Sequence, residues 1–197
     1  MLRFLYLAGI GYLGICLLAI GVGRAGGPVH SGTGAGVALA VPPGRGDGGT
    51  WFAGIKPFCN SVEVETAQQR NPPPGGADGQ GYSAACYALA GRIEQARTVI
   101  ERLSGDDRSY AASIVFGVGH PVADAGDDKS AGPIMELVIE FQPDNYMALY
   151  HAGMSEYVLG QPDLAEQHLR RFLELYHAND GWRTNAVEVL QRLSGGP

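Results

Sequence analysis

Three glycines recur at nearly constant spacing in the C-terminal half of this sequence. Gly91, Gly126 and Gly160 each end an apolar run, and the two intervals between them differ by a single position. Each glycine has a small residue seven positions before it and an alanine five positions after it: Ala84, Gly119 and Gly153, then Ala96, Ala131 and Ala165. A fixed period of this length is typical of proteins built from stacked helix pairs, in which small residues allow the paired helices to approach closely.

The residues between these glycines carry a family pattern. The third unit has it most fully, at Leu149, Ala152, Gly153, Gly160, Ala165, Leu169 and Phe172, and the first unit has it at Ala84, Tyr87, Gly91, Ala96, Ile100 and Leu103. The pattern resembles the tetratricopeptide repeat, a helix–turn–helix unit of about 34 residues. The resemblance covers about residues 79–176 and implies an all-α fold, a short solenoid of about three helix pairs.

Two parts of the predicted repeat domain, residues 79–197, depart from this pattern. The first helix of the second unit is degenerate, because the segment GVGHPVADAGDD introduces Pro121 and several turn formers. The C-terminal segment, from Asp180 onward, is predicted to form a capping helix. Asp180 suits the start of that helix, and Ala186, Leu190 and Leu193 give it a single apolar stripe. A helix of this kind covers the last exposed face of a solenoid.

The segment of residues 1–24 is predicted to form a transmembrane helix. Residues 4–23 contain no charged side chain, and a helix of this length matches a hydrocarbon core of about 30 Å. A cleaved signal peptide is the alternative, with Gly23 and Ala25 as its small residues, but the run is long for a signal. A retained signal-anchor is favoured. It would make the chain a single-pass protein of a bacterial-type inner membrane, with the repeat domain on the periplasmic side.

Two segments join this anchor to the repeats. Residues 25–50 are predicted to be a linker, since nearly half of them are Gly or Pro. Residues 51–78 are predicted to hold an apolar docking segment and a short helix. The docking cluster, which would rest either on the repeat domain or against a membrane partner, consists of Trp51, Phe52, Ile55 and Phe58.

The short helix of this segment has two competing interpretations. Asn60 and Glu63 have the spacing of a capping box for a helix that ends before Pro72. The alternation of Val62, Val64 and Thr66 fits a strand equally well.

Charge and cysteine content limit the classes of partner and cofactor. From residue 51 onward, 11 Lys and Arg stand against 19 Asp and Glu, a formal charge of −8. Such a surface argues against nucleic acid or anionic lipid as the main partner. There is no CxxC or CxxCH motif, so neither a zinc knuckle nor attached haem is supported. Cys59 and Cys86 would form a disulfide in an oxidising compartment, or would remain two buried thiols.

The sequence shows no constellation of catalytic or metal-binding residues. None of the five histidines pairs with another at metal-ligand spacing on one helix. His151 is expected to be structural or to line a groove, and His168 lies on the apolar side of its helix. Asp124 to Asp128 are expected to form a solvated acidic loop, with a hard cation as the alternative. We therefore predict a non-enzymatic protein with no cofactor and no metal.

A groove lined by the first helices of successive repeats is the predicted functional site. In the tetratricopeptide family these helices line the concave face of the solenoid. By register, the third unit would present Met147, Tyr150, Met154, Tyr157 and Val158 to a protein partner. Aromatic rings and thioethers suit such a surface, although several of these side chains would alternatively pack against the neighbouring helix.

These features together predict a membrane-anchored interaction subunit. It would stabilise a larger membrane complex, such as a respiratory or photosynthetic one, through its transmembrane helix, linker and repeat domain. The alternative is an assembly factor that binds client peptides in the groove. The expected partners are proteins, and neither nucleic acid nor a small-molecule substrate is expected.

Overall fold

The computed structural model describes residues 47–195, and this part of the chain is all-α, as predicted. The predicted transmembrane helix, residues 1–24, lies outside the described residues, as does most of the predicted linker. Among the helices that are described, none combines the length and the apolar character needed to cross a membrane. The helices are α1 (Gly48–Ile55), α2 (Val64–Arg70), α3 (Gly76–Leu89), α4 (Ile93–Glu101), α5 (Asp106–Asp124), α6 (Asp128–Phe141), α7 (Tyr146–Val158), α8 (Pro162–Leu175) and α9 (Gly181–Ser194), with a 3₁₀ turn, η1 (Lys56–Phe58).

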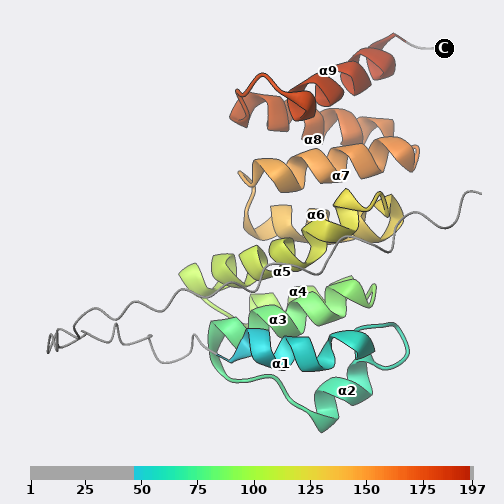
Figure 1. Ribbon diagram of the computed structural model, residues 1–197. Coiled ribbons are helices and arrows are strands. Elements are labelled where there is room, and N and C mark those ends of the chain that lie inside the picture. The colour runs from blue at the N-terminus through green and yellow to red at the C-terminus, as the bar shows by residue number, and fades with distance from the viewer. Residues whose placement is uncertain (1–46, 196–197) are drawn as a thin grey trace, which may run out of the picture. The chain divides into compact units, whose positions relative to one another are not determined.

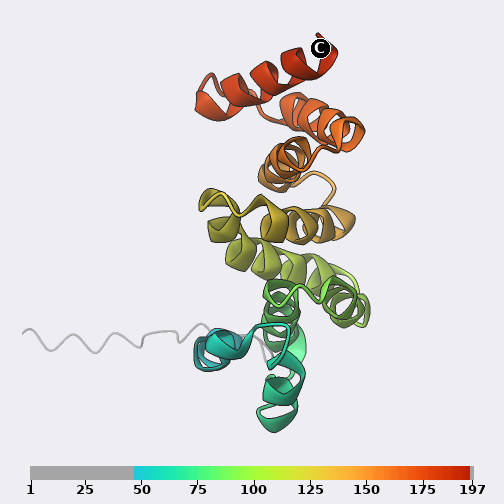
Figure 2. The same cartoon turned by 90° about the vertical axis from the view of Figure 1, so that its right-hand side faces the viewer.

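These helices stack in chain order as consecutive pairs (Figures 1 and 2). Helix α3 packs against α4, α5 against α6, and α7 against α8, while α9 covers α7 and α8 as a final layer. The first helices of successive pairs also contact one another, from α3 through α5 and α7 to α9. This is the arrangement of helix pairs that the repeat predicted.

The recurring glycines end the first helix of each pair. Gly91, Gly126 and Gly160 have φ values of +70°, +76° and +75°. In each case the amide after the glycine donates to a carbonyl five residues earlier, for example Arg92 N to Tyr87 O at 2.9 Å. This bond is the mark of a Schellman motif, which requires a left-handed residue that glycine adopts without a steric penalty. The same turn therefore reverses the chain three times.

Small residues fill the places where the paired helices cross. Ala84, Ala96, Ala131 and Ala165 are completely buried. A Cβ added to Gly119 would lie 2.5 Å from Ile134 Cγ2, which is closer than two carbon atoms can approach. The spacing that indicated the repeat thus marks the tightest contacts between helices.

Helix α5 is continuous although the repeat pattern is degenerate in this segment. It runs unbroken from Asp106 to Asp124 with Pro121 inside its last turn. A proline removes one hydrogen bond and crowds the carbonyl four residues earlier. That residue is Gly117, which is exposed, and only a few residues of helix follow the proline. Burial of Ala111, Ala112 and Val115 against neighbouring helices outweighs this local cost.

The elements α1, η1 and α2 form an N-terminal layer that packs on α3. Trp51, Phe52 and Ile55 are buried against it in one apolar cluster, so they pack on the repeat domain, while Phe58 is exposed. Helix α1 begins at Gly48, so the last three residues of the predicted linker are helical. The next segment is a helix and not a strand, because residues Val64–Arg70 form α2, which ends before Pro72 as predicted.

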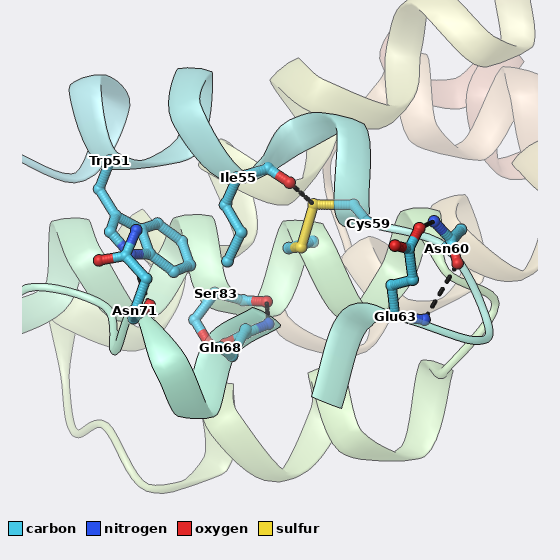
Figure 3. The surroundings of a disulfide bond; sticks show 9 residues. Trp51, Ile55, Cys59, Asn60, Glu63, Gln68, Asn71 and Ser83 are labelled. Carbon is cyan, nitrogen blue, oxygen red and sulfur yellow. Dashed lines mark hydrogen bonds between the residues drawn. A yellow bond between two sulfur atoms is a disulfide. The ribbon is translucent and has the colours of Figure 1, made fainter. Parts of the chain in front are cut away.

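Covalent and polar contacts fasten this layer (Figure 3). A disulfide joins Cys59, after η1, to Cys86 of α3. The Trp51 indole donates to the Asn71 carbonyl at 2.9 Å, and the buried Ser83 hydroxyl donates to Gln68 Oε1 at 2.5 Å. The N-terminal layer is therefore a fixed part of the domain.

Two glycines of α5 offer a matched test of helix packing. We expect Gly119→Ala to lower the free energy of unfolding by about 1–3 kcal/mol, because Ile134 is fully buried and cannot yield. Gly117→Ala is the control: within the described part of the chain nothing lies within 4 Å of its added Cβ. It should raise stability by about 0.5–1 kcal/mol, since alanine favours a helix. Urea denaturation measures both, and equal effects would contradict the packing described.

Loss of the disulfide should lower stability as well. The bond closes a loop with a sequence separation of 27 residues, so we expect Cys59→Ala/Cys86→Ala to cost about 3–4 kcal/mol. The measurement is urea unfolding with and without a reducing agent. Reduction should destabilise the wild-type protein and leave the double variant unchanged. Insensitivity of the wild-type protein would contradict the bond.

Candidate functional site

A row of rings crosses the first helices of three successive layers. The Phe116 ring stacks on His120 at a centroid distance of 5.0 Å, both on α5. His120 meets His151 of α7 edge-on at 4.7 Å, and His151 meets Trp182 of α9 at 5.6 Å. We call Phe116, His120, His151 and Trp182 the aromatic row. It exists because α5, α7 and α9 lie side by side in the stack.

Tyr150 supports this row from the core. Its side chain is only 5% exposed, and its ring packs edge-on against Phe172 at 5.1 Å and Trp182 at 4.9 Å. Asn185 Nδ2 donates to its hydroxyl at 3.4 Å. Tyr150 therefore holds Trp182 in position and has little surface of its own to offer a partner.

An open hollow adjoins the aromatic row at Phe116. It has a volume of about 580 Å³ and lies between α5 and the α6–α7 connection. Its lining is mixed: Ser109, Phe116, Phe141, Gln142, Pro143, Asp144, Asn145, Tyr146 and Met147. Tyr146 is 43% exposed and Trp182 is 37% exposed, so large rings remain accessible at the hollow and at the far end of the row.

The five predicted groove residues do not share one face. Met147 lines the hollow, whereas Tyr150, Met154 and Tyr157 belong to the apolar cluster of α7, α8 and α9. Val158 is 61% exposed at the end of α7. Partner binding by these residues stays a prediction, and within the set Met147 has the most suitable position.

The repeat itself contained a signal for the residues that sequence reasoning missed. Phe116 and His120 lie one repeat length before Tyr150 and Met154, at equivalent positions of the preceding unit. Subtracting one repeat length from the predicted groove positions Tyr150 and Met154 therefore identifies Phe116 and His120. Trp182 had no such signal, because α9 is a capping helix outside the three predicted pairs.

The histidines of the row are held in unusual surroundings. His151 is 6% exposed, and its burial, assisted by the neighbouring His120, lowers its pKa to about 4, although Asp124 and Asp128 act in the opposite direction. His151 is therefore neutral at physiological pH. Among residues 47–195, the Nε2 atoms of His120 and His151 are both buried and have no hydrogen-bond partner.

The acidic residues from the end of α5 to the start of α6 are largely exposed, as expected for a solvated loop, and they also make local and inter-helix contacts. Asp124 belongs to the last turn of α5. Asp127 caps α6 by accepting from the Ser130 amide at 3.3 Å, and Asp128 accepts from the Ser155 hydroxyl of α7 at 3.2 Å. This segment therefore joins α5, α6 and α7.

A second polar cluster lies inside the stack. Glu156 of α7 is 1% exposed, and both of its carboxylate oxygens lie within 2.9 Å of His168 Nδ1 on α8. On α6, burial raises the pKa of Glu136 above its usual range, and the adjacent Glu156 raises it further. The enclosed pair of Glu156 and His168 has the character of a structural contact between helices.

Comparison with known proteins supports one repeat directly. The family model of the tetratricopeptide repeat matches residues 147–176, which correspond to α7 and α8. No curated protein and no solved structure matches the chain. A tetratricopeptide-like unit in an all-helical stack indicates a role in protein–protein interaction.

Removal of His168 should reveal the cost of the buried pair. We expect His168→Ala to lower the free energy of unfolding by about 3–5 kcal/mol, because Glu156 would stay buried without its partner. His177→Ala, at an exposed position, should change stability by less than about 0.5 kcal/mol. Thermal or urea denaturation measures both. Adding Glu156→Gln to His168→Ala should cost less than the sum of the single changes, and strict additivity would contradict the contact.

Proposed function

We propose that this protein is a non-catalytic interaction subunit that is tethered to a membrane and binds another protein of a membrane complex. The observation that carries the proposal is the aromatic row with the adjoining hollow. The aromatic row lies on the first helices of successive layers, the hollow lies between α5 and the α6–α7 connection, and both leave large rings accessible. The bound element would be a segment of the partner that lies across α5, α7 and α9.

The chemistry of this surface favours a particular kind of segment. Tyr146 and Trp182 offer rigid rings, which give contact area at a small entropic cost. Asp144, Gln142 and Asn145 add polar groups to the hollow. With a formal charge of −8 from residue 51 onward, the domain favours a segment with apolar and basic side chains over an acidic one.

The tether rests on the sequence. Residues 4–23 are uncharged and are bracketed by Arg3 and Arg24, which suits a single membrane-spanning helix. Attachment to the same membrane raises the effective concentration of the domain near its partner, so contacts of modest strength suffice.

The disulfide supports a location of the repeat domain on the periplasmic side of the membrane. Disulfides persist in oxidising compartments and are rare in the cytosol. The bond between Cys59 and Cys86 fits a domain on the periplasmic side of a bacterial-type inner membrane, which is the orientation of a signal-anchor.

Substitutions in the hollow and on the aromatic row test the proposed surface. The native membrane is extracted in mild detergent, and the proteins that co-purify with the full chain are quantified. Tyr146→Ala/Trp182→Ala should reduce recovery of the stoichiometric partner at least tenfold, since large rings often dominate an interface. Leu164→Ala is the matched control, because Leu164 is 43% exposed on α8, away from the row, and its loss should leave recovery unchanged. Equal recovery from both variants would overturn the proposed surface.

Deletion of residues 1–46 tests the tether separately. The remaining chain should leave the membrane fraction and recover less partner, while its helical circular dichroism signal stays that of a folded domain. Retention at the membrane with full partner recovery would contradict tethering.

A further inference from the structure

We infer that His120, Asp124 and His151 form a binding site for a divalent transition-metal ion, of which Zn²⁺ is the representative. One ligand atom from each of the three side chains lies within 4.8 Å of the others. Two ligands come from the last turns of α5, and the third comes from α7 in the next helix pair. The site shares His120 and His151 with the aromatic row, but metal binding at it does not require the proposed partner.

The distances are close to those that a metal ion needs. Asp124 Oδ1 lies 3.6 Å from His120 Nε2 and 3.8 Å from His151 Nε2. Ligands bonded to a tetrahedral zinc ion at about 2.0–2.1 Å lie about 3.4 Å from one another. Small changes in side-chain rotamer therefore bring these atoms to coordination distance, whereas both separations are too long for a hydrogen bond.

The backbone fixes this arrangement. His120 and Asp124 are four residues apart on α5, so they lie on the same face one turn apart. His151 meets this face because α7 packs beside α5. Gly119, next to His120, brings α5 close to α6, and it thereby restricts how far this end of α5 can shift.

The unpartnered nitrogens point to a missing ligand. The Nε2 atoms of both histidines are buried and, within the described residues, accept and donate no hydrogen bond. Leaving a buried polar atom unsatisfied is costly, and native proteins rarely do so. His151 is more than nine-tenths buried, so its side chain is held in the site. A metal ion would satisfy both nitrogens at once.

The donor set determines the class of metal. Two imidazole nitrogens with one carboxylate oxygen suit Zn²⁺ or Fe²⁺, whereas Ca²⁺ and Mg²⁺ prefer oxygen ligands alone. The carboxylates of Asp124 and Asp128 add negative charge that favours a cation.

Such an ion would act as a clamp between layers. It would join α5 to α7 across neighbouring helix pairs, and it would fix the two central rings of the aromatic row. Asp124 is half exposed and His120 is partly exposed, so the ion has a route from solvent and room for a further ligand. With three protein ligands, that position would hold water.

Direct metal binding by the full chain tests the inference. The protein is purified in mild detergent, treated with a chelator and titrated with Zn²⁺ in competition with a chromophoric chelator. Titration with Co²⁺ follows, because its visible spectrum reports the coordination of the bound ion. We expect one equivalent of Zn²⁺ to bind, a higher melting temperature on binding, and a Co²⁺ spectrum of a four- or five-coordinate site.

Matched variants assign the ligands. Asp124→Asn and His120→Asn, which change partly exposed side chains, should each weaken Zn²⁺ binding at least tenfold while circular dichroism stays unchanged. His177→Asn removes an exposed histidine of the α8–α9 connection and should bind Zn²⁺ as the wild type does. Absence of stoichiometric Zn²⁺ binding, or binding that neither ligand variant weakens, would overturn the inference.

Discussion

The close crossing of paired helices is the constraint on which the rest of the structure depends. Each pair needs a left-handed glycine to reverse the chain and small residues where the helices touch, such as Gly119 against Ile134. These short-range requirements set the distance between layers, and the distance between layers brings α5, α7 and α9 side by side. The aromatic row and the cluster of His120, Asp124 and His151 exist because of that spacing.

The same requirements explain which features were predictable from the sequence. Left-handed glycines and buried alanines leave a periodic trace, so the helix pairs and their turns could be predicted. The continuity of α5 could not, because Pro121 signals a break and the burial that overrides it comes from other helices. Contacts between side chains of different pairs, such as His120 with His151, depend on rotation and offset between helices, which a single sequence does not specify. For that reason the sequence left open whether Tyr150 lines a groove or packs against the neighbouring helix, and in the structure its ring lies in the core.

Polar groups between the layers complement the apolar packing. Glu156 and His168 join α7 to α8, while Asp128 and Ser155 join the start of α6 to α7. Buried polar contacts contribute little net stability, but each is satisfied in one geometry only. In a stack of similar helices, they add to the tight apolar crossings in fixing the register between neighbours.

The disulfide of the N-terminal layer has a mechanical consequence. Tension that reaches the domain along the chain from its N-terminal end first peels away α1 and η1, which are held by noncovalent contacts. At Cys59 the load passes through the covalent bond to Cys86, which lies near the end of α3 in the first helix pair. The segment between the two cysteines, which contains α2 and most of α3, is thereby shielded from the pull. After α1 and η1 are lost, the pull therefore acts on the end of α3, and the elements before Cys86 cannot be extended one at a time while the bond is intact.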